Sequence, residues 1–178
     1  ERAPPVHVPF DAWGRRIDEI RVSPAWRALH RIAAQEGIVA TAYERMNEES
    51  RVHQFALLFL YHPSSAIYSC PLAMTDGAAR VLEIEGEEEI RREIFPHLVS
   101  RDPNEMWTAG QWMTERRGGS DVRGTDTVAR RDRGGLRLYG DKWFTSATTS
   151  EIALTLARIE GSSELSLFIV RLGDGEGR

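Results

Sequence analysis

A change in hydrophobic periodicity near residue 105 constrains the fold of this 178-residue chain more than any other feature. Before it, apolar residues recur at spacings of three and four, as on the buried face of a helix. After it, short apolar runs are separated by glycine, aspartate and serine, which is typical of a β-sheet. The sequence therefore predicts an α+β fold, with an all-α helical domain over residues 1–105 and a β-domain over residues 106–178.

The first half of the chain carries several helix signals and helix breakers. Three prolines in the first ten residues predict an extended segment, and Asp11 is expected to cap a short helix through about Val22. Ser23 and Pro24 suit the N-cap and the first position of the next helix. The further expected helices cover residues 24 to about 46, about 48 to 62, a segment that Pro71 starts or kinks, and 87 to 98, where Pro96 shortens or kinks the helix.

The second half carries strand signals separated by glycine-rich and serine-rich turns. Because a sheet that stopped at the last strand would leave an exposed edge and face, we expect more protein after the final residues RLGDGEGR, either in the natural molecule or in a partner. The expected strands cover residues 136–139, 152–157 and 165–170.

Composition narrows the possible functions. The formal charge of -4 arises from mixed acidic and basic residues, so bulk electrostatics favours neither nucleic acid nor membrane. Cys70 is the only cysteine, which excludes an intrachain disulfide and a multi-thiolate metal site and suits a reducing compartment. The five histidines show no metal-binding spacing. No apolar run reaches eighteen residues, and we therefore expect a cytoplasmic protein that binds no metal.

The stretch from Gln111 to Ser146 holds the candidate functional residues. Its two ends, WMT at 112–114 and WFTS at 143–146, combine tryptophan with small hydroxyl residues and are joined by apparent strands, so they could meet around one flat ligand. The Gly118-Gly119 pair with Ser120 either binds an anion or forms a structural turn. No GxxxxGK[ST] motif is present, and no GxGxxG follows a strand, which argues against a P-loop and a Rossmann site.

Two segments of this stretch resemble the middle-domain signature of the acyl-CoA dehydrogenase family. They are MTERRGGSDV at 113–122 and, about twenty residues later, GDKWFTS at 140–146. In addition, CPLAMT at 70–75 resembles a segment of the branch that includes AidB, the alkylation-response flavoprotein. The resemblance implies a flavoprotein that binds FAD, with an N-terminal helical domain, a middle β-barrel or β-sandwich domain and a C-terminal helical bundle, the last of which this chain lacks.

The resemblance also implies roles for particular residues. Backbone groups of residues 111–114 bind the polar edge of the flavin, the hydroxyls of Thr114 and Ser146 approach its reactive nitrogen, and Phe144 stacks against its ring. Ser120 contacts FAD or the thioester, whereas Asp121 orders the loop and Glu115 supports it rather than acting as a base. The expected cofactor-binding residues are Gln111, Trp112, Met113, Thr114, Ser120, Phe144, Thr145 and Ser146.

Three functions follow as alternatives. The first is FAD-dependent α,β-dehydrogenation of an acyl thioester such as acyl-CoA, for which the catalytic glutamate would come from the C-terminal bundle, so that this chain supplies no catalytic residue. The second is an AidB-like stress-response flavoprotein that associates with DNA. The third is a scaffold without flavin. Family members form homo-oligomers, and a membrane partner is not expected.

Overall fold

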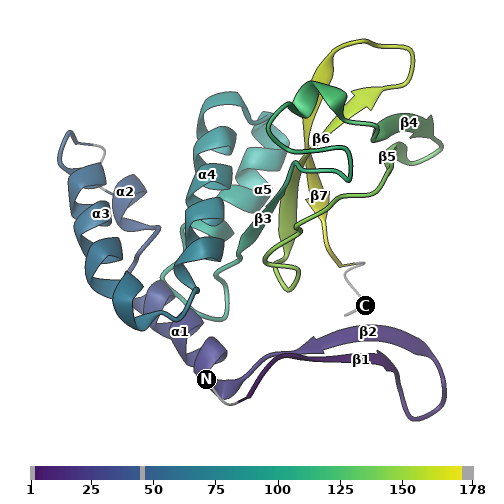
Figure 1. Ribbon diagram of the computed structural model, residues 1–178. Coiled ribbons are helices and arrows are strands. Elements are labelled where there is room, and N and C mark those ends of the chain that lie inside the picture. The colour runs from purple at the N-terminus through teal and green to yellow at the C-terminus, as the bar shows by residue number, and fades with distance from the viewer. Residues whose placement is uncertain (1–2, 45–46, 174–178) are drawn as a thin grey trace. The chain divides into compact units, whose positions relative to one another are not determined.

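The computed structural model describes residues 3–44 and 47–173 (Figure 1). The chain forms two compact units, the first ending at Thr108 and the second running from Ala109 to Leu172. Helices dominate the first unit and strands the second, so the predicted α+β class is confirmed. No helix in the described ranges is long and apolar enough to cross a membrane.

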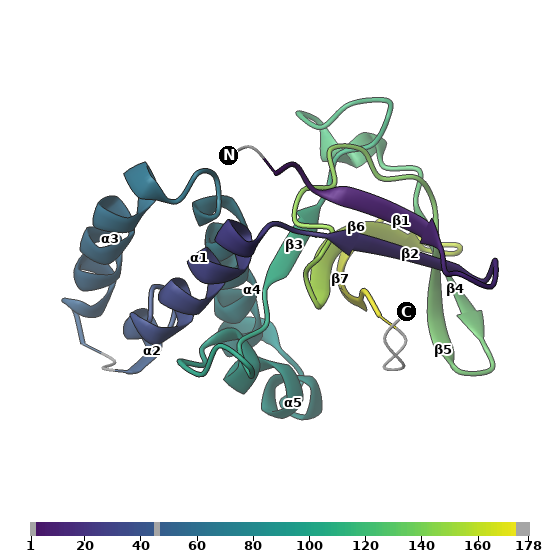
Figure 2. The same ribbon diagram turned by 90° about the horizontal axis from the view of Figure 1, so that it is seen from below.

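The first unit begins with a hairpin of two antiparallel strands, β1 (Val6–Phe10) and β2 (Arg16–Arg21). Figure 2 shows this hairpin leading into the first helix. The predicted helix from Asp11 to Val22 is therefore wrong. The Asp11 carboxylate accepts hydrogen bonds from the backbone amides of Trp13 and Arg15, each at 2.9 Å, and closes the turn between the strands. An aspartate that suits a helix N-cap suits such a turn equally well, because both use the same side-chain-to-amide bond.

Helix α1 (Pro24–Gln35) starts as predicted, with the Ser23 hydroxyl accepting a hydrogen bond from the amide of Trp26 at 3.1 Å. Its predicted extension to residue 46 is wrong, because the chain turns at Gly37, which has a φ of +65°, and then forms the short helix α2 (Thr41–Glu44). The predicted end at Met46 lies outside the described residues.

Arg101 explains the turn between α1 and α2. Its guanidinium lies where a side chain at Gly37 would have to be. It donates to the carbonyl of Gln35 at 3.1 Å and to both carboxylate oxygens of Glu44, at 2.5 and 2.9 Å. The arginine therefore satisfies the end of α1 and requires glycine beside it.

The three remaining α-helices are α3 (Ser50–Tyr61), α4 (Ser69–Glu85) and α5 (Glu88–Leu98). A short 3₁₀ helix, η1 (His62–Ser64), separates α3 from α4 at the predicted proline break, and Pro96 lies inside α5. The main core joins α1, the following turn and the start of α4, and its buried residues are Ala33, Ala34, Ile38, Val39, Tyr68, Leu72 and Met106.

The second unit is a mixed five-stranded sheet made of β3 (Ala109–Trp112), β4 (Val128–Asp132), β5 (Gly135–Tyr139), β6 (Ile152–Ile159) and β7 (Leu165–Arg171). Strand β6 is central: it runs parallel to β3 and β4 along one edge and antiparallel to β7 along the other. The three strands predicted after residue 135 are confirmed. The final residues, 174–178, lie outside the described part of the chain.

Candidate functional site

The two ends of the 111–146 stretch lie side by side in the second unit. The carbonyl of Thr114 accepts a hydrogen bond from the amide of Trp143 at 2.8 Å, and the indole Nε1 of Trp112 donates to the carbonyl of Ser146 at 2.9 Å. The hydroxyl of Thr155, on β6, donates to the carbonyl of Trp112 at 2.6 Å. These bonds tie the end of β3 to the loop that precedes β6, so the segments of Thr114 and Ser146 meet as the sequence predicts.

An exposed aromatic pair marks the loop that precedes β6. Trp143 and Phe144 are 51% and 80% exposed, and their rings meet edge to face with centroids 6.1 Å apart. Phe144 has a φ of +56° and Ala147 one of +55°, in the left-handed region that side chains other than glycine avoid. Strained residues of this kind concentrate at binding sites, and the strained residue here is a large ring that remains mostly in solvent, with Trp143 against one edge. The loop is therefore suited to a planar ligand.

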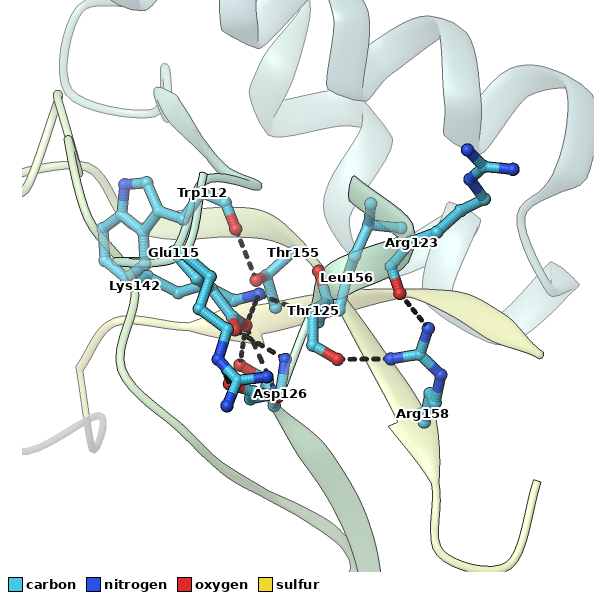
Figure 3. A network of polar contacts seen from close by, with 11 residues as sticks. Trp112, Glu115, Arg123, Thr125, Asp126, Lys142, Thr155, Leu156 and Arg158 are labelled. Atoms are coloured by element: carbon cyan, nitrogen blue, oxygen red, sulfur yellow. Dashed lines mark hydrogen bonds and ion pairs between the residues drawn. The ribbon is translucent and has the colours of Figure 1, made fainter. Parts of the chain in front are cut away.

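Beneath this loop lies a buried ion pair between Glu115 and Lys142, whose side chains are 7% and 10% exposed. Figure 3 shows the polar contacts around it. The ammonium lies 2.7 Å from Glu115 Oε1 and also donates to the carbonyl of Leu156 at 2.8 Å. The carboxylate further accepts hydrogen bonds from the Asp126 amide at 2.6 Å and from both the amide and the hydroxyl of Thr127.

This environment fixes the charge of Glu115. Burial by itself raises the pKa of a carboxyl group, but the hydrogen bonds from Lys142, Thr127 and the backbone amide of Asp126 outweigh burial and lower the pKa of Glu115 to about 2. A carboxylate with this pKa stays ionised near neutrality and is a poor proton acceptor. The expectation that Glu115 supports the loop, and is not a base, agrees with this geometry.

Two glycines allow the close approaches that shape the site. A Cβ atom on Gly119 would lie 2.5 Å from the hydroxyl oxygen of Thr114, and one on Gly140 would lie 2.8 Å from the backbone Cα of Thr127. Both distances are too short for a side chain. The glycine of the GGSD segment thus lets its loop pack directly on Thr114, and Gly140 lets the end of β5 pass close to β4.

One structural arginine is not marked by any sequence pattern. Arg158, on β6, donates from its guanidinium to the carbonyl of Arg123, inside the short helix η2 (Val122–Gly124), and to that of Thr125, directly after it (Figure 3). It also donates to the carbonyl of Ser163 at 3.1 Å. It anchors the loop after the glycine pair. No motif marks it, because the carbonyls of Arg123 and Thr125 lie more than thirty residues earlier in the chain.

The other predicted site residues lie around this arrangement. Asp121 accepts a hydrogen bond from the Arg123 amide at 3.1 Å and so orders its own loop, as expected. Gln111 is exposed on β3, and Met113 and Thr145 are half-buried beside the joined segments. Ser120 is exposed, and no described contact brings it to Thr114 or Ser146. The roles of these residues toward a flavin remain predictions.

Comparisons with known proteins agree with the resemblance. Residues 1–104 match the family model described as the adaptive response protein AidB N-terminal domain, and residues 110–177 match the acyl-CoA dehydrogenase middle domain. The chain belongs to the acyl-CoA dehydrogenase family, in its AidB-like branch.

Two curated relatives illustrate this membership. Acyl-CoA dehydrogenase family member 11 of Caenorhabditis elegans is 46% identical over 94% of this chain and 30% of the relative. The putative acyl-CoA dehydrogenase AidB of Escherichia coli is 34% identical over 97% of this chain and 34% of the relative. The chain thus spans about a third of the length of these relatives.

Solved structures show the same fold. The crystal structure of Caenorhabditis elegans ACDH-11 in complex with C11-CoA superposes with a TM-score of 0.88 at 44% identity, covering 97% of this chain and 32% of that one. An acyl-CoA dehydrogenase from Bacillus anthracis, complexed with FAD, superposes with a TM-score of 0.66 at 20% identity, covering 82% of this chain and 25% of that one. The second likeness concerns the fold alone.

Proposed function

We propose that the second unit forms part of an FAD site in a flavoprotein that dehydrogenates acyl thioesters. The observation that carries the proposal is the joining of the Thr114 and Ser146 segments by two hydrogen bonds beside the strained, exposed ring of Phe144. A planar cofactor needs a stacking surface and fixed polar groups at its edge, and the joined segments offer both.

The residues present fit this cofactor. Residues 111–114 would hold its polar edge through backbone groups, the hydroxyls of Thr114, Thr145 and Ser146 would lie near its reactive ring, and Phe144 would shield the ring from water. Ser120 would contact the cofactor or the thioester. When bound, FAD accepts the two electrons released from the substrate. The protein contributes fixed donors, which favour the charge that the reduced ring gains.

Acyl-CoA is the substrate class that we propose, and the C11-CoA complex of ACDH-11 supports it. No side chain of the described site suits the base that takes a proton from the substrate, since Glu115 is held ionised by Lys142. We propose that this base, and the assembly into homo-oligomers, belong to the whole protein. The AidB family match favours a second candidate, a stress-response flavoprotein that associates with DNA.

Titration of the apo protein with FAD, followed by absorbance and flavin fluorescence, tests the cofactor assignment. Thr114→Val removes a hydroxyl and keeps the side-chain shape, and Ser146→Ala leaves intact the carbonyl that Trp112 binds. Each should weaken FAD binding by about 1 kcal/mol, or roughly fivefold, or shift its reduction potential. Thr148→Val, an exposed change two residues beyond Ser146, is the control.

Unchanged binding and potential in both variants would count against the assignment, and a protein that binds no FAD would favour a scaffold. Anaerobic addition of acyl-CoA to the flavin-loaded whole protein, which carries the proposed base, then separates the two flavoprotein candidates. Bleaching of the flavin absorbance is expected for a dehydrogenase, and persistence of the absorbance would favour the AidB-like alternative.

A further inference from the structure

A rigid turn beside the aromatic pair presents an arginine. Glu115 and Gly118 exchange two backbone hydrogen bonds, the amide of Glu115 donating at 3.1 Å and that of Gly118 at 2.9 Å, and Gly118 has a φ of +141°. Arg116 and Arg117 therefore occupy the tip of a closed turn. The buried carboxylate of Glu115 fixes one end of the turn to the sheet.

The side chain of Arg116 is positioned by Trp143. Its Cζ atom lies over the indole ring, 5.7 Å from the centroid, at a distance where a cation is attracted to an aromatic face. Trp143 is itself held by the hydrogen bond that its backbone amide donates to the carbonyl of Thr114. The guanidinium is thus held in place before any ligand arrives, which reduces the entropy lost when it binds.

Charge pairing distinguishes Arg116 from its neighbours. Arg117 lies 3.1 Å from the carboxylate of Asp126, Arg123 lies 2.8 Å from that of Asp121, and Lys142 is paired with Glu115. Across the described residues, no carboxylate comes within ion-pair distance of Arg116, whose guanidinium lies over the ring of Trp143 instead. The positive charge of Arg116 is therefore available to a ligand.

A guanidinium that lies over an aromatic ring still has N–H groups that can donate, and this planar fork matches two oxygens of one phosphate. The loop that follows the turn, residues 118–120, is exposed and carries only the small hydroxyl of Ser120. We propose that Arg116 binds a phosphoryl group of a nucleotide ligand. This deepens the proposed function and rests on it: the phosphoryl group belongs either to the pyrophosphate of FAD or to the CoA part of the substrate.

Calorimetric titration of the protein with FAD, riboflavin and CoA tests this proposal. Riboflavin has the ring of FAD without its phosphates, and CoA has phosphates without the flavin ring. Arg116→Gln should weaken the binding of one phosphate-bearing ligand about five- to tenfold and leave riboflavin binding unchanged. The difference in affinity between wild type and Arg116→Gln should shrink as salt is added, because salt screens the attraction between Arg116 and the phosphoryl group in the wild type. Arg117→Gln, at the next position of the same turn, is the matched control and should change binding much less, since Asp126 already neutralises Arg117.

The ligand affected identifies the source of the phosphoryl group. A loss confined to FAD assigns Arg116 to the cofactor, and one confined to CoA assigns it to the substrate. Equal losses for riboflavin and FAD, equal effects of the Arg116 and Arg117 variants, or unchanged affinities for all three ligands would each overturn the proposal. If the wild type binds CoA but neither flavin, the proposed FAD site fails and the CoA titration alone decides the role of Arg116. Matching thermal unfolding of both variants and the wild type shows that the substitutions leave the fold intact.

Discussion

At the scale of single residues, the Glu115–Lys142 pair shows how a buried charge can serve structure. The carboxylate is surrounded by donors from three segments of the second unit, so it holds the end of β3, the start of β4 and the loop at Lys142 together. Removing one partner of such a pair leaves the other charge buried without compensation. The pair is therefore a stabilising element directly next in the chain to Thr114 and Trp143, whose backbones join the two segments of the proposed cofactor site.

Glu115→Gln should lower the free energy of unfolding by about 3 kcal/mol at neutral pH, which corresponds to a pKa lowered from 4.5 to about 2. Urea or guanidinium denaturation measures the change. Asp121→Asn is the matched control, because Asp121 is exposed although it pairs with Arg123, and exposed pairs contribute little. A loss for Glu115→Gln no larger than that for Asp121→Asn would contradict the structural role of the pair.

The same pair makes stability depend on pH. The folded protein lowers the pKa of Glu115, so its contribution is complete above the unfolded value of 4.5 and is lost as the pH falls toward about 2. The stability difference between wild type and Glu115→Gln should therefore be constant from pH 7 to about 5 and narrow at lower pH. A difference that stays constant down to pH 3 would show that the low pKa is absent.

The sequence predicted the positions of the candidate residues better than their surroundings. Thr114 and Ser146 lie in recognisable motifs, so their convergence could be expected from the resemblance. The free charge of Arg116 could not, because it depends on which arginine of the turn reaches Asp126 and which reaches Trp143. Pairings of this kind follow from side-chain directions in the folded state, and a sequence pattern does not contain them.

At the scale of elements, hydrophobic spacing predicted the later helices and strands correctly. It failed near the N-terminus, where the same spacing fits both a helix and a strand. Ile17 and Ile20 are three residues apart, which fits a helical face, yet both lie on β2. Pro9 lies where the register of the hairpin shifts, between Val8 and Phe10. A proline has no amide for the ladder, and the sequence alone did not show that a bulge would accommodate it. Gly37 ends the first helix, but the apolar spacing continues past it and so predicted a longer helix.

Gly140→Ala should destabilise the protein, because the new methyl group would meet the backbone of Thr127 at 2.8 Å and force β5 away from β4. Overpacking of this kind costs about 1–3 kcal/mol. Gly134→Ala, in the turn between the same two strands, is the control: a methyl group there meets no atom within 4 Å. Thermal and chemical denaturation of the two variants compare them directly. Equal stabilities would mean that the close approach at Gly140 does not constrain the sheet.

At the scale of the whole molecule, the first unit exposes an apolar surface beside its core. The surface runs along α3 and reaches α4, where a groove is lined mainly by apolar side chains. Phe55 and Phe59, which line this groove, are 61% and 78% exposed. A contiguous apolar patch that is exposed to water tends to bind other apolar molecules. The surface should therefore be detectable in this chain by a hydrophobic dye.

Phe59→Gln should lower the fluorescence of bound anilinonaphthalene sulfonate while changing the free energy of unfolding by no more than about 0.5 kcal/mol, because the ring is largely exposed and glutamine favours a helix. Leu72→Ala is the contrasting variant: Leu72 is 1% exposed, and its truncation should cost about 2–5 kcal/mol. If Phe59→Gln left the dye signal unchanged, the groove would not be the dye site. If it destabilised the fold as much as Leu72→Ala, Phe59 would belong to the core, because the loss of an exposed ring cannot remove that much buried area.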